Sequence, residues 1–263
     1  MIVMLTVIDG LRPDAIAAAD CPNLKALLQR SAYTLHARTV LPCITLPCHM
    51  SMFHGVPPTR HGVTSNDWQP MARPLPGLVD VAKPAGKRCA FFTSWEPLRD
   101  LSRPGALFYS VYVDNLIDLD ADLRVAEAAA KAIQTNPIDF AFVYLGVVDN
   151  VGHDFGWMSD AYLAEVAKAD RALGILLDAL SDREHALLLQ ADHGGHERFH
   201  GLDIPEDMEI PWMVSGMGIR RGYEIPSPVT ILDTAPTLAR LLGVTPHAQW
   251  EGRCVEEIFE ESS

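Results

Sequence analysis

The sequence predicts an α/β protein with a doubly wound, largely parallel central sheet and helices on both faces. Short apolar runs alternate along the chain with longer amphipathic segments, which is typical of strands joined by crossover helices. Several of these runs are apolar throughout, as expected for parallel strands that are covered on both sides. Three of the runs are each followed by an aspartate, and open α/β sheets bind their ligands at that carboxyl edge.

The size of the chain bounds its organisation. Its 263 residues are enough for one sizeable core. We therefore expect a single α/β domain over residues 1–263, and leave open a small substrate-side insertion around residues 67–120.

Charge and cysteine content restrict the partners. The formal net charge of −13 argues against a surface for nucleic-acid polymers, which need clustered Lys and Arg. Five irregularly spaced cysteines without a CxxC pair favour free thiols. The apolar runs fall short of the roughly 20 residues of a membrane span. We expect a cytoplasmic protein without membrane contact, and the sequence leaves its oligomeric state open.

The first predicted strand is Ile2–Ile8, IVMLTVI, which runs directly into Asp9. This places Asp9 at the carboxyl end of a central strand, where a ligand is expected. The alternative is that Asp9 only caps a helix over Ala15–Ala19.

A helix is predicted over Asn23–Arg30, followed by a strand within Ser31–Leu41. Pro47 fits the first turn of a further helix that runs to about Phe53. Thr45 then lies at or just before the beginning of that helix, where free backbone N–H groups favour an anion. The alternative is that Thr45 serves only as an N-cap hydroxyl.

The next segment is less regular. Val56–Asn66 is expected to be a loop because of its two prolines and glycine, and Cys89–Thr93 a buried strand. The non-periodic stretch from residue 94 to 105 contains Trp95 and Arg99, which would either line a substrate pocket or belong to a surface loop.

A helix is predicted over Asp120–Gln134, and the apolar strand Phe140–Leu145 follows it. After this strand come Asp149 and, four residues later, His153. The remaining predicted elements are a helix over Tyr162–Leu180, a strand over Ile210–Ser215 and a helix over Leu232–Leu242.

The densest cluster of chemistry follows the predicted strand Ala186–Leu189. Within nine positions the chain carries Asp192, His193, His196 and His200. Carboxylate oxygen and imidazole nitrogen suit zinc, and manganese less tightly. A single histidine is more often structural, but this cluster lies at the end of one buried strand and so favours a metal site.

The three strand ends bring Asp9, Asp149 and Asp192 to one edge of the predicted sheet. A single Asp/His centre explains all three acids together, and their number suits two divalent ions better than one. Two such ions can bind both the attacking and the leaving oxygen of a phosphoryl displacement. Thr45 at a helix N-terminus is a good candidate for the nucleophile.

The chain resembles the alkaline phosphatase superfamily, and within it the nucleotide pyrophosphatase/phosphodiesterase branch, also known as type I phosphodiesterases. Three blocks carry the resemblance: residues 7–12, VIDGLR; residues 45–49, TLPCH, with Gly55 and the later His61-Gly62-Val63; and DNVGH at 149–153 followed by Asp192-His193-Gly194. The blocks occur in the family's order and span most of the chain.

The resemblance implies two zinc ions, one bound by Asp9, Thr45, Asp192 and His193. The second would be bound by Asp149, His153 and a third histidine, for which we choose His200 because it precedes a glycine. His196 then stays as a neighbouring or substrate-facing residue. Thr45 would be the covalent nucleophile, passing through a phospho-threonine. The resemblance further implies that Asn66 and the backbone N–H that follows Thr45 bind phosphoryl oxygens.

Two positions depart from the family pattern. Cys48 replaces the usual Asn before His49, and Leu46 replaces an aromatic residue that often stacks on a nucleobase. The segment from Gly201 to Trp212 resembles small bacterial phosphodiesterase-like and phosphonoacetate hydrolase-like members. We expect a phosphodiesterase or nucleotide pyrophosphatase acting on a small phosphorylated substrate. Phosphonate or phosphate monoester hydrolysis, a phosphoglycerate mutase-like isomerase and a non-catalytic metal-binding domain are the alternatives.

Overall fold

The computed structural model describes residues 1–67, 69–71 and 73–260, and within them it contains one eight-stranded sheet in the order β4-β3-β5-β1-β6-β7-β2-β8. The predicted α/β class with a largely parallel sheet is confirmed. In chain order the strands are β1 (Ile2–Ile8), β2 (Ala32–Arg38), β3 (Cys89–Thr93), β4 (Tyr109–Tyr112), β5 (Phe140–Leu145), β6 (His185–Gln190), β7 (Glu209–Gly216) and β8 (Tyr223–Glu224).

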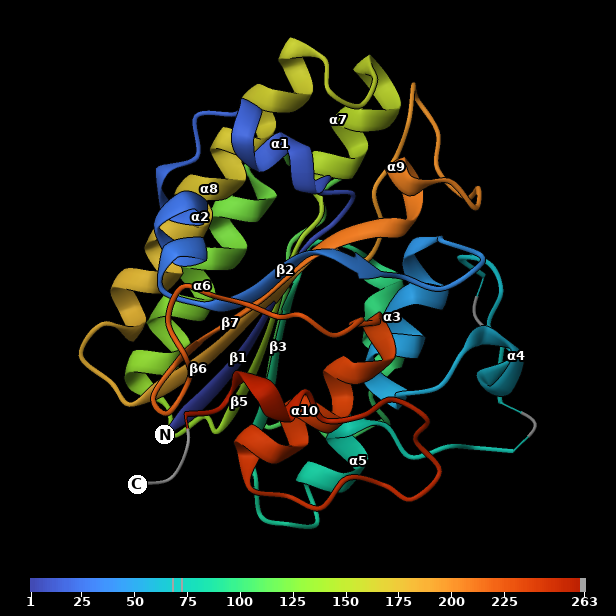
Figure 1. The fold of residues 1–263 in the computed structure, drawn as a ribbon. Coiled ribbons are helices and arrows are strands. Elements are labelled where there is room, and N and C mark those ends of the chain that lie inside the picture. Colours follow the sequence, from blue (N-terminus) through green and yellow to red (C-terminus); the bar gives the residue numbers. More distant parts are fainter. Residues whose placement is uncertain (68, 72, 261–263) are drawn as a thin grey trace.

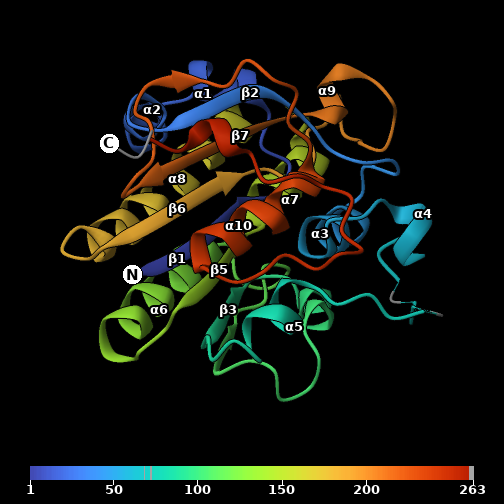
Figure 2. The ribbon, with the colours of Figure 1, turned by 60° about the horizontal axis from the view of Figure 1, so that its bottom comes forward.

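The α-helices are α1 (Pro13–Ala18), α2 (Pro22–Gln29), α3 (Thr45–His54), α4 (Pro58–His61), α5 (Leu78–Ala82), α6 (Ala121–Thr135), α7 (Val147–Phe155), α8 (Asp160–Leu180), α9 (Pro205–Met208) and α10 (Thr234–Leu242). Helices α1, α2, α6 and α8 cover one face of the sheet, whereas α3, α5 and α10 cover the other (Figure 1). Figure 2 shows α10 in front of the sheet and α8 behind it. The predicted coverage of both faces is therefore confirmed.

Strand β1 lies in the middle of the sheet, between β5 and β6, and every one of its residues is buried. It pairs in parallel with β5 and with β6, placing Ile8 opposite Leu145 and Val7 opposite Gln190. These registers bring the carboxyl ends of the three strands to the same edge, and the residues that follow them meet there.

The sheet is not parallel throughout. Strand β7 runs antiparallel to both β6 and β2. The predicted strand over Ile210–Ser215 lies within β7, but its apolar composition carried no information about direction. Direction depends on the path of the chain between the strands, which amino-acid patterns do not encode.

The region predicted as a loop, Val56–Asn66, contains the short helix α4. Pro58 is the first residue of α4, a position at which the missing N–H of proline costs no hydrogen bond. Strands β4 and β8 lack a buried apolar run, and the side chains of β4 are mostly exposed at the edge of the sheet. No helix in the described part of the chain is long and apolar enough to cross a membrane. All five cysteines are free thiols, as expected.

Candidate metal centre and nucleophile

The first group of ligand-type side chains lies at the carboxyl ends of β1 and β6. His193 Nε2 is 3.2 Å from Asp9 Oδ1 and 3.5 Å from Asp192 Oδ2, and all three residues are buried. The alternative role of Asp9 as a helix cap is wrong, because the N-cap of α1 is Arg12. Three of the four predicted ligands of the first ion are thus brought together.

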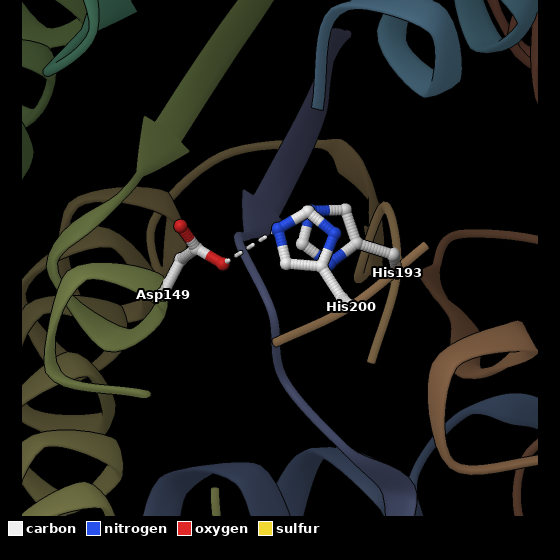
Figure 3. A group of neighbouring side chains, drawn as sticks. All are labelled: Asp149, His193 and His200. Atoms are coloured by element: carbon white, nitrogen blue, oxygen red, sulfur yellow. Dashed lines mark ion pairs between the residues drawn. The ribbon is translucent and has the colours of Figure 1, made fainter. Parts of the chain in front are cut away.

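The second group forms around Asp149, which lies in the first turn of α7. Asp149 Oδ1 is 3.7 Å from His200 Nε2, and the carboxylate faces the stacked rings of His200 and His193 (Figure 3). His153, one turn further along α7, has Nε2 at 3.5 Å from Asp149 Oδ2. Donor atoms of Asp149, His193 and His200 lie within 4.8 Å of one another, as do those of Asp9, Asp192 and His193.

The histidine rings of this centre are oriented by the backbone. Nδ1 of His193 donates to the carbonyl oxygen of Gly194 at 2.8 Å, and Nδ1 of His200 donates to that of Cys43 at 2.8 Å. In the same way Nδ1 of His153 is bonded to the carbonyl of Arg198 at 3.0 Å. A proton held on Nδ1 leaves Nε2 as a lone-pair donor, which is the arrangement found in metal-ligating histidines.

The acids of the centre have oxygens without a hydrogen-bond partner. Oδ1 of Asp9, Oδ1 of Asp149 and Oδ2 of Asp192 are buried and accept no hydrogen bond from the residues that the structure describes. Burial raises the pKa of Asp9 and Asp149 well above the usual range, with neighbouring carboxyls adding to the effect, and raises the pKa of Asp192 to about 7. Burying several carboxyls together is costly unless cations neutralise them. The donor set therefore fits divalent ions with mixed oxygen and nitrogen ligands.

Thr45 is the first residue of α3 and is buried beside the first group. Its Oγ1 lies 3.4 Å from His193 Nε2. The alternative role as an N-cap is wrong, since Ile44 holds the N-cap position without a side-chain cap bond. A hydroxyl at a helix N-terminus, next to ligand-type nitrogens, suits the attack on a phosphoryl group.

Asn66 reaches the same helix end from the loop after α4. Its Oδ1 accepts a hydrogen bond from Leu46 N–H at 3.0 Å. We expected this N–H to bind a phosphoryl oxygen, but in the structure it is already hydrogen-bonded to Asn66 Oδ1. The Nδ2 group of Asn66 can donate to a phosphoryl oxygen instead. Leu46 itself is fully buried.

Three further predicted residues have partners elsewhere. His196 Nδ1 is bonded to Asp207 Oδ1 at 2.7 Å. Trp95 packs against the hydrophobic core, and the exposed Arg99 pairs with Glu96 and Asp100. These contacts do not join Trp95 or Arg99 to the Asp/His centre.

Sequence reasoning gave no role to three residues that support the centre. The hydroxyl of Tyr144 donates to Asp9 Oδ2. The carboxylate of Asp122 accepts the N–H groups of Gly146 at 2.8 Å and Val147 at 3.1 Å, and so fixes the beginning of α7. Tyr144 lies on the strand that precedes Asp149, but nothing in the local sequence links Asp122 to that helix.

Trp157 is the third of these residues. Its Nε1–H donates to the carbonyl of Gly10 at 2.9 Å. A Cβ at Gly195 would lie 2.2 Å from the indole, and one at Gly152 would lie 2.7 Å from it, so both glycines are required for this packing. The indole also meets the ring of His153 edge-on, with centroids 5.0 Å apart. It thus contacts three of the four segments that carry the metal-ligand candidates.

This architecture is that of the alkaline phosphatase superfamily. Murine ectonucleotide pyrophosphatase / phosphodiesterase 5 has a TM-score of 0.84 at 15% identity, over 99% of this chain and 100% of that chain. A phosphonate monoester hydrolase from Silicibacter pomeroyi has a TM-score of 0.79 at 14% identity, over 100% of this chain and 77% of that chain. At these identities the likeness shows the fold alone.

The sequence assigns the family more narrowly. The family described as type I phosphodiesterase / nucleotide pyrophosphatase matches residues 3–75 and 78–203, and the chain belongs to it. A venom phosphodiesterase of Macrovipera lebetinus is 25% identical over 73% of this chain and 25% of its own length. Ectonucleotide pyrophosphatase/phosphodiesterase family member 1 of Mus musculus is 27% identical over 73% of this chain and 24% of its own length. The chain thus spans about a quarter of the length of these relatives.

Proposed function

We propose that the protein is a two-metal phosphoric ester hydrolase that cleaves small phosphodiesters or nucleotide pyrophosphates through a covalent phospho-Thr45 intermediate. The observation that carries this proposal is the position of the Thr45 hydroxyl, at the start of α3 and 3.4 Å from His193 Nε2, beside acids with unpaired oxygens. A purely structural metal site has no need of a hydroxyl at this position, so a non-catalytic domain explains the arrangement less well.

Seven residues would hold the two ions: Asp9, Thr45, Asp192 and His193 for one, and Asp149, His153 and His200 for the other. Zinc is the better match to this donor set, and manganese is the alternative. When bound, the ions would neutralise charge on the phosphoryl oxygens and lower the pKa of a coordinated hydroxyl.

The remaining steps belong to the chain. Thr45 Oγ1, having lost its proton to solvent, forms a bond to phosphorus as the bond to the leaving oxygen breaks. Water then attacks the phosphorus of the phospho-threonine ester, the bond to Oγ1 breaks, and Oγ1 takes up a proton again. Asn66 would orient the phosphoryl group through Nδ2, since its Oδ1 is already bonded to Leu46 N–H. Removal of one such donor from an enzyme typically costs about 10²–10³ in turnover.

The substrate is proposed to be small, because a formal net charge of −13 disfavours the binding of a nucleic-acid polymer. We also propose that residues 1–263 act as one domain. A cytoplasmic location stays a prediction, since the relatives named above include a venom protein and an ectonucleotide pyrophosphatase/phosphodiesterase.

The test begins with metal analysis of the purified protein, followed by hydrolysis of bis-p-nitrophenyl phosphate, p-nitrophenyl phosphate and a p-nitrophenyl phosphonate ester. We expect about two divalent ions per chain and a preference for the diester. Thr45→Ala should lower turnover by at least about 10³-fold while both ions stay bound. A preference for the monoester or the phosphonate would assign one of the alternative hydrolases, and unchanged turnover in Thr45→Ala would rule out the covalent mechanism.

A further inference from the structure

A pocket of about 240 Å³ lies at the amino edge of the sheet, the end at which β1 begins in Figure 1. Its walls include three arginines, Arg30, Arg183 and Arg221. The candidate metal centre follows the opposite ends of β1 and β6, so the length of β6, about 20 Å, separates the two features. The pocket is therefore distinct from the Asp/His centre.

The sheet itself brings the three arginines together. Strand β7 runs antiparallel to both β6 and β2, and β8 runs parallel to β2, so β2, β6 and β8 all begin at the same edge. Arg30, Arg183 and Arg221 each lie two residues before the first residue of one of these strands. Their convergence thus follows from the strand pairing, although they are far apart in the sequence.

The positive charge of this pocket is not neutralised by the protein. Within the part of the chain that the structure describes, Arg30, Arg183 and Arg221 form no ion pair, and Arg183 donates to the carbonyl of Gln134 at 3.3 Å. One carboxylate lines the pocket, that of Glu184, so three positive charges and one negative charge leave a local charge of +2. In a chain with a net charge of −13, such a gathering of like charges favours an anion.

Ser215 gives the pocket a buried donor. Its side chain lines the pocket and is only 4% exposed, and its hydroxyl has no hydrogen-bond partner among the described residues. Buried hydroxyls are mostly hydrogen-bonded, so an unpaired one in a pocket wall indicates a ligand. The wall is fixed at the next residue, since an added Cβ at Gly216 would lie 2.3 Å from the carbonyl oxygen of His185.

The helix ends at this edge offer another explanation for two of the arginines. Arg30 is the C-cap of α2, and Arg183 binds a carbonyl in the last turn of α6, where cations compensate the helix dipole. This explanation does not extend to Arg221, which lies in the turn between β7 and β8. It also leaves the unpaired hydroxyl of Ser215 without a role.

We propose that this pocket binds the phosphate group of a small molecule, either inorganic phosphate or a small phosphate monoester. Guanidinium groups bind phosphate oxygens through paired, charge-assisted hydrogen bonds, and the Ser215 hydroxyl adds a further donor. The volume is below the roughly 300–1,000 Å³ of sites for larger ligands, which suits such a small anion. The proposal is independent of the hydrolase mechanism, because it uses none of the residues of the Asp/His centre.

The test measures the modification of individual arginines by phenylglyoxal in the metal-loaded wild-type protein, with peptide mass spectrometry as the readout. Inorganic phosphate is raised at constant ionic strength, set with chloride, so that general screening does not change. We expect phosphate to slow the modification of Arg30, Arg183 and Arg221 with a single half-saturation concentration. Arg171 on α8 is the internal control, because it is also exposed and lies outside the pocket, and its rate should not change.

Variants separate a built site from overall charge. Arg221→Gln should raise the phosphate concentration that half-protects Arg30 by about tenfold or more, and Ser215→Ala should raise it by about three- to tenfold. Arg221→Lys keeps the charge and should recover part of the loss. Arg171→Gln removes the same charge from α8 and should leave the protection of Arg30 unchanged. Thermal unfolding of each variant verifies that the protein is folded.

Methylphosphonate, a stable analogue of a phosphate monoester, distinguishes the two sources of the anion. Half-protection at a lower concentration of methylphosphonate than of phosphate assigns an ester as the ligand, and the reverse order assigns free phosphate. Protection of the three arginines that is absent with both anions, or no greater than that of Arg171, overturns the proposal. Equal effects of Arg221→Gln and Arg171→Gln also overturn it. Because the readout needs no turnover, failure of the proposed hydrolase leaves this result unaffected.

Discussion

The imidazole rings of His193 and His200 are stacked, with centroids 3.8 Å apart and planes 17° from parallel. One ring belongs to the group of Asp9 and Asp192, and the other faces Asp149. The two candidate ion sites therefore share these stacked rings as a common wall, and a substitution of one ring changes the packing of the other.

This shared wall makes the choice between His200 and His196 testable. His200→Ala should remove one of two bound ions, because it takes away an Nε2 donor that lies 3.7 Å from Asp149 Oδ1. His196→Ala should keep both ions, since His196 belongs to neither group of ligand-type side chains. Metal content after equilibrium dialysis measures both. Retention of two ions by His200→Ala, with loss of one by His196→Ala, would reverse the assignment.

The substitution Asp149→Asn should change stability in opposite directions in the metal-free and in the metal-loaded protein. Burial, followed by the nearby Asp9, raises the pKa of Asp149, which means that the ionised carboxylate is disfavoured in the folded protein without a cation. Asp149→Asn removes that charge. We expect the metal-free variant to be more stable than the metal-free wild type by about 1–3 kcal/mol, and the metal-loaded variant to be less stable.

Urea unfolding with and without a chelator gives the four free energies of this comparison. Asp154→Asn on the same helix is a suitable control, because Asp154 is exposed and lies outside both ligand groups. If a chelator destabilises Asp149→Asn as much as it destabilises the wild type, Asp149 is not a ligand.

Much of this centre could be predicted because its acids follow runs that are buried on both faces. Strands β1, β5 and β6 are largely apolar segments; Asp9 directly follows β1, and Asp192 follows β6 after one residue. The parts that could not be predicted depend on contacts between distant residues. Trp157 reaches Gly10 across 147 positions, and Asp122 reaches Gly146 across 24. Neither partner is marked by spacing or periodicity.

Trp157 should support both the fold and the second ion. Trp157→Ala removes a buried indole that fills the space above Gly152 and Gly195, and is expected to cost about 3–5 kcal/mol of stability. Trp157→Phe keeps an aromatic ring but loses the bond to the Gly10 carbonyl, at a cost of about 1 kcal/mol. Because the indole packs on His153, each variant should also weaken the binding of the second ion, and Trp157→Ala should lower its affinity by about 10–100-fold.

Thermal unfolding and metal titration of the two variants check these values. The comparison with Trp250 serves as a control, since Trp250 is also buried and also donates to a backbone carbonyl, that of Pro76, but lies outside the ligand groups. If Trp250→Phe weakens the second ion as much as Trp157→Phe, the effect is a general loss of stability.

Stability towards acid should depend on His61. Its Nδ1 accepts from Val63 N–H at 3.1 Å, so Nε2–H is the donor in the 3.0 Å bond to Ser51, the opposite tautomer to that of the metal-centre histidines. Burial lowers the pKa of His61 to about 4, against an ordinary 6.5. Above pH 6.5 the ring is neutral in both states. Between 6.5 and 4 only the unfolded chain binds the proton, so the free energy of unfolding falls as pH falls, with a slope approaching about 1.4 kcal/mol per pH unit.

His61→Asn should lose this contribution, because no imidazole is left to titrate at that position, even though the variant is less stable at neutral pH. Ser51→Ala is the matched control, since it breaks the same hydrogen bond but leaves the buried ring in place and should keep the slope. Urea unfolding from pH 4 to 7.5 measures the difference between each variant and the wild type, in which the contributions of the other buried histidines cancel. Equal slopes in His61→Asn and the wild type would show that His61 already binds its proton in the folded protein over this range.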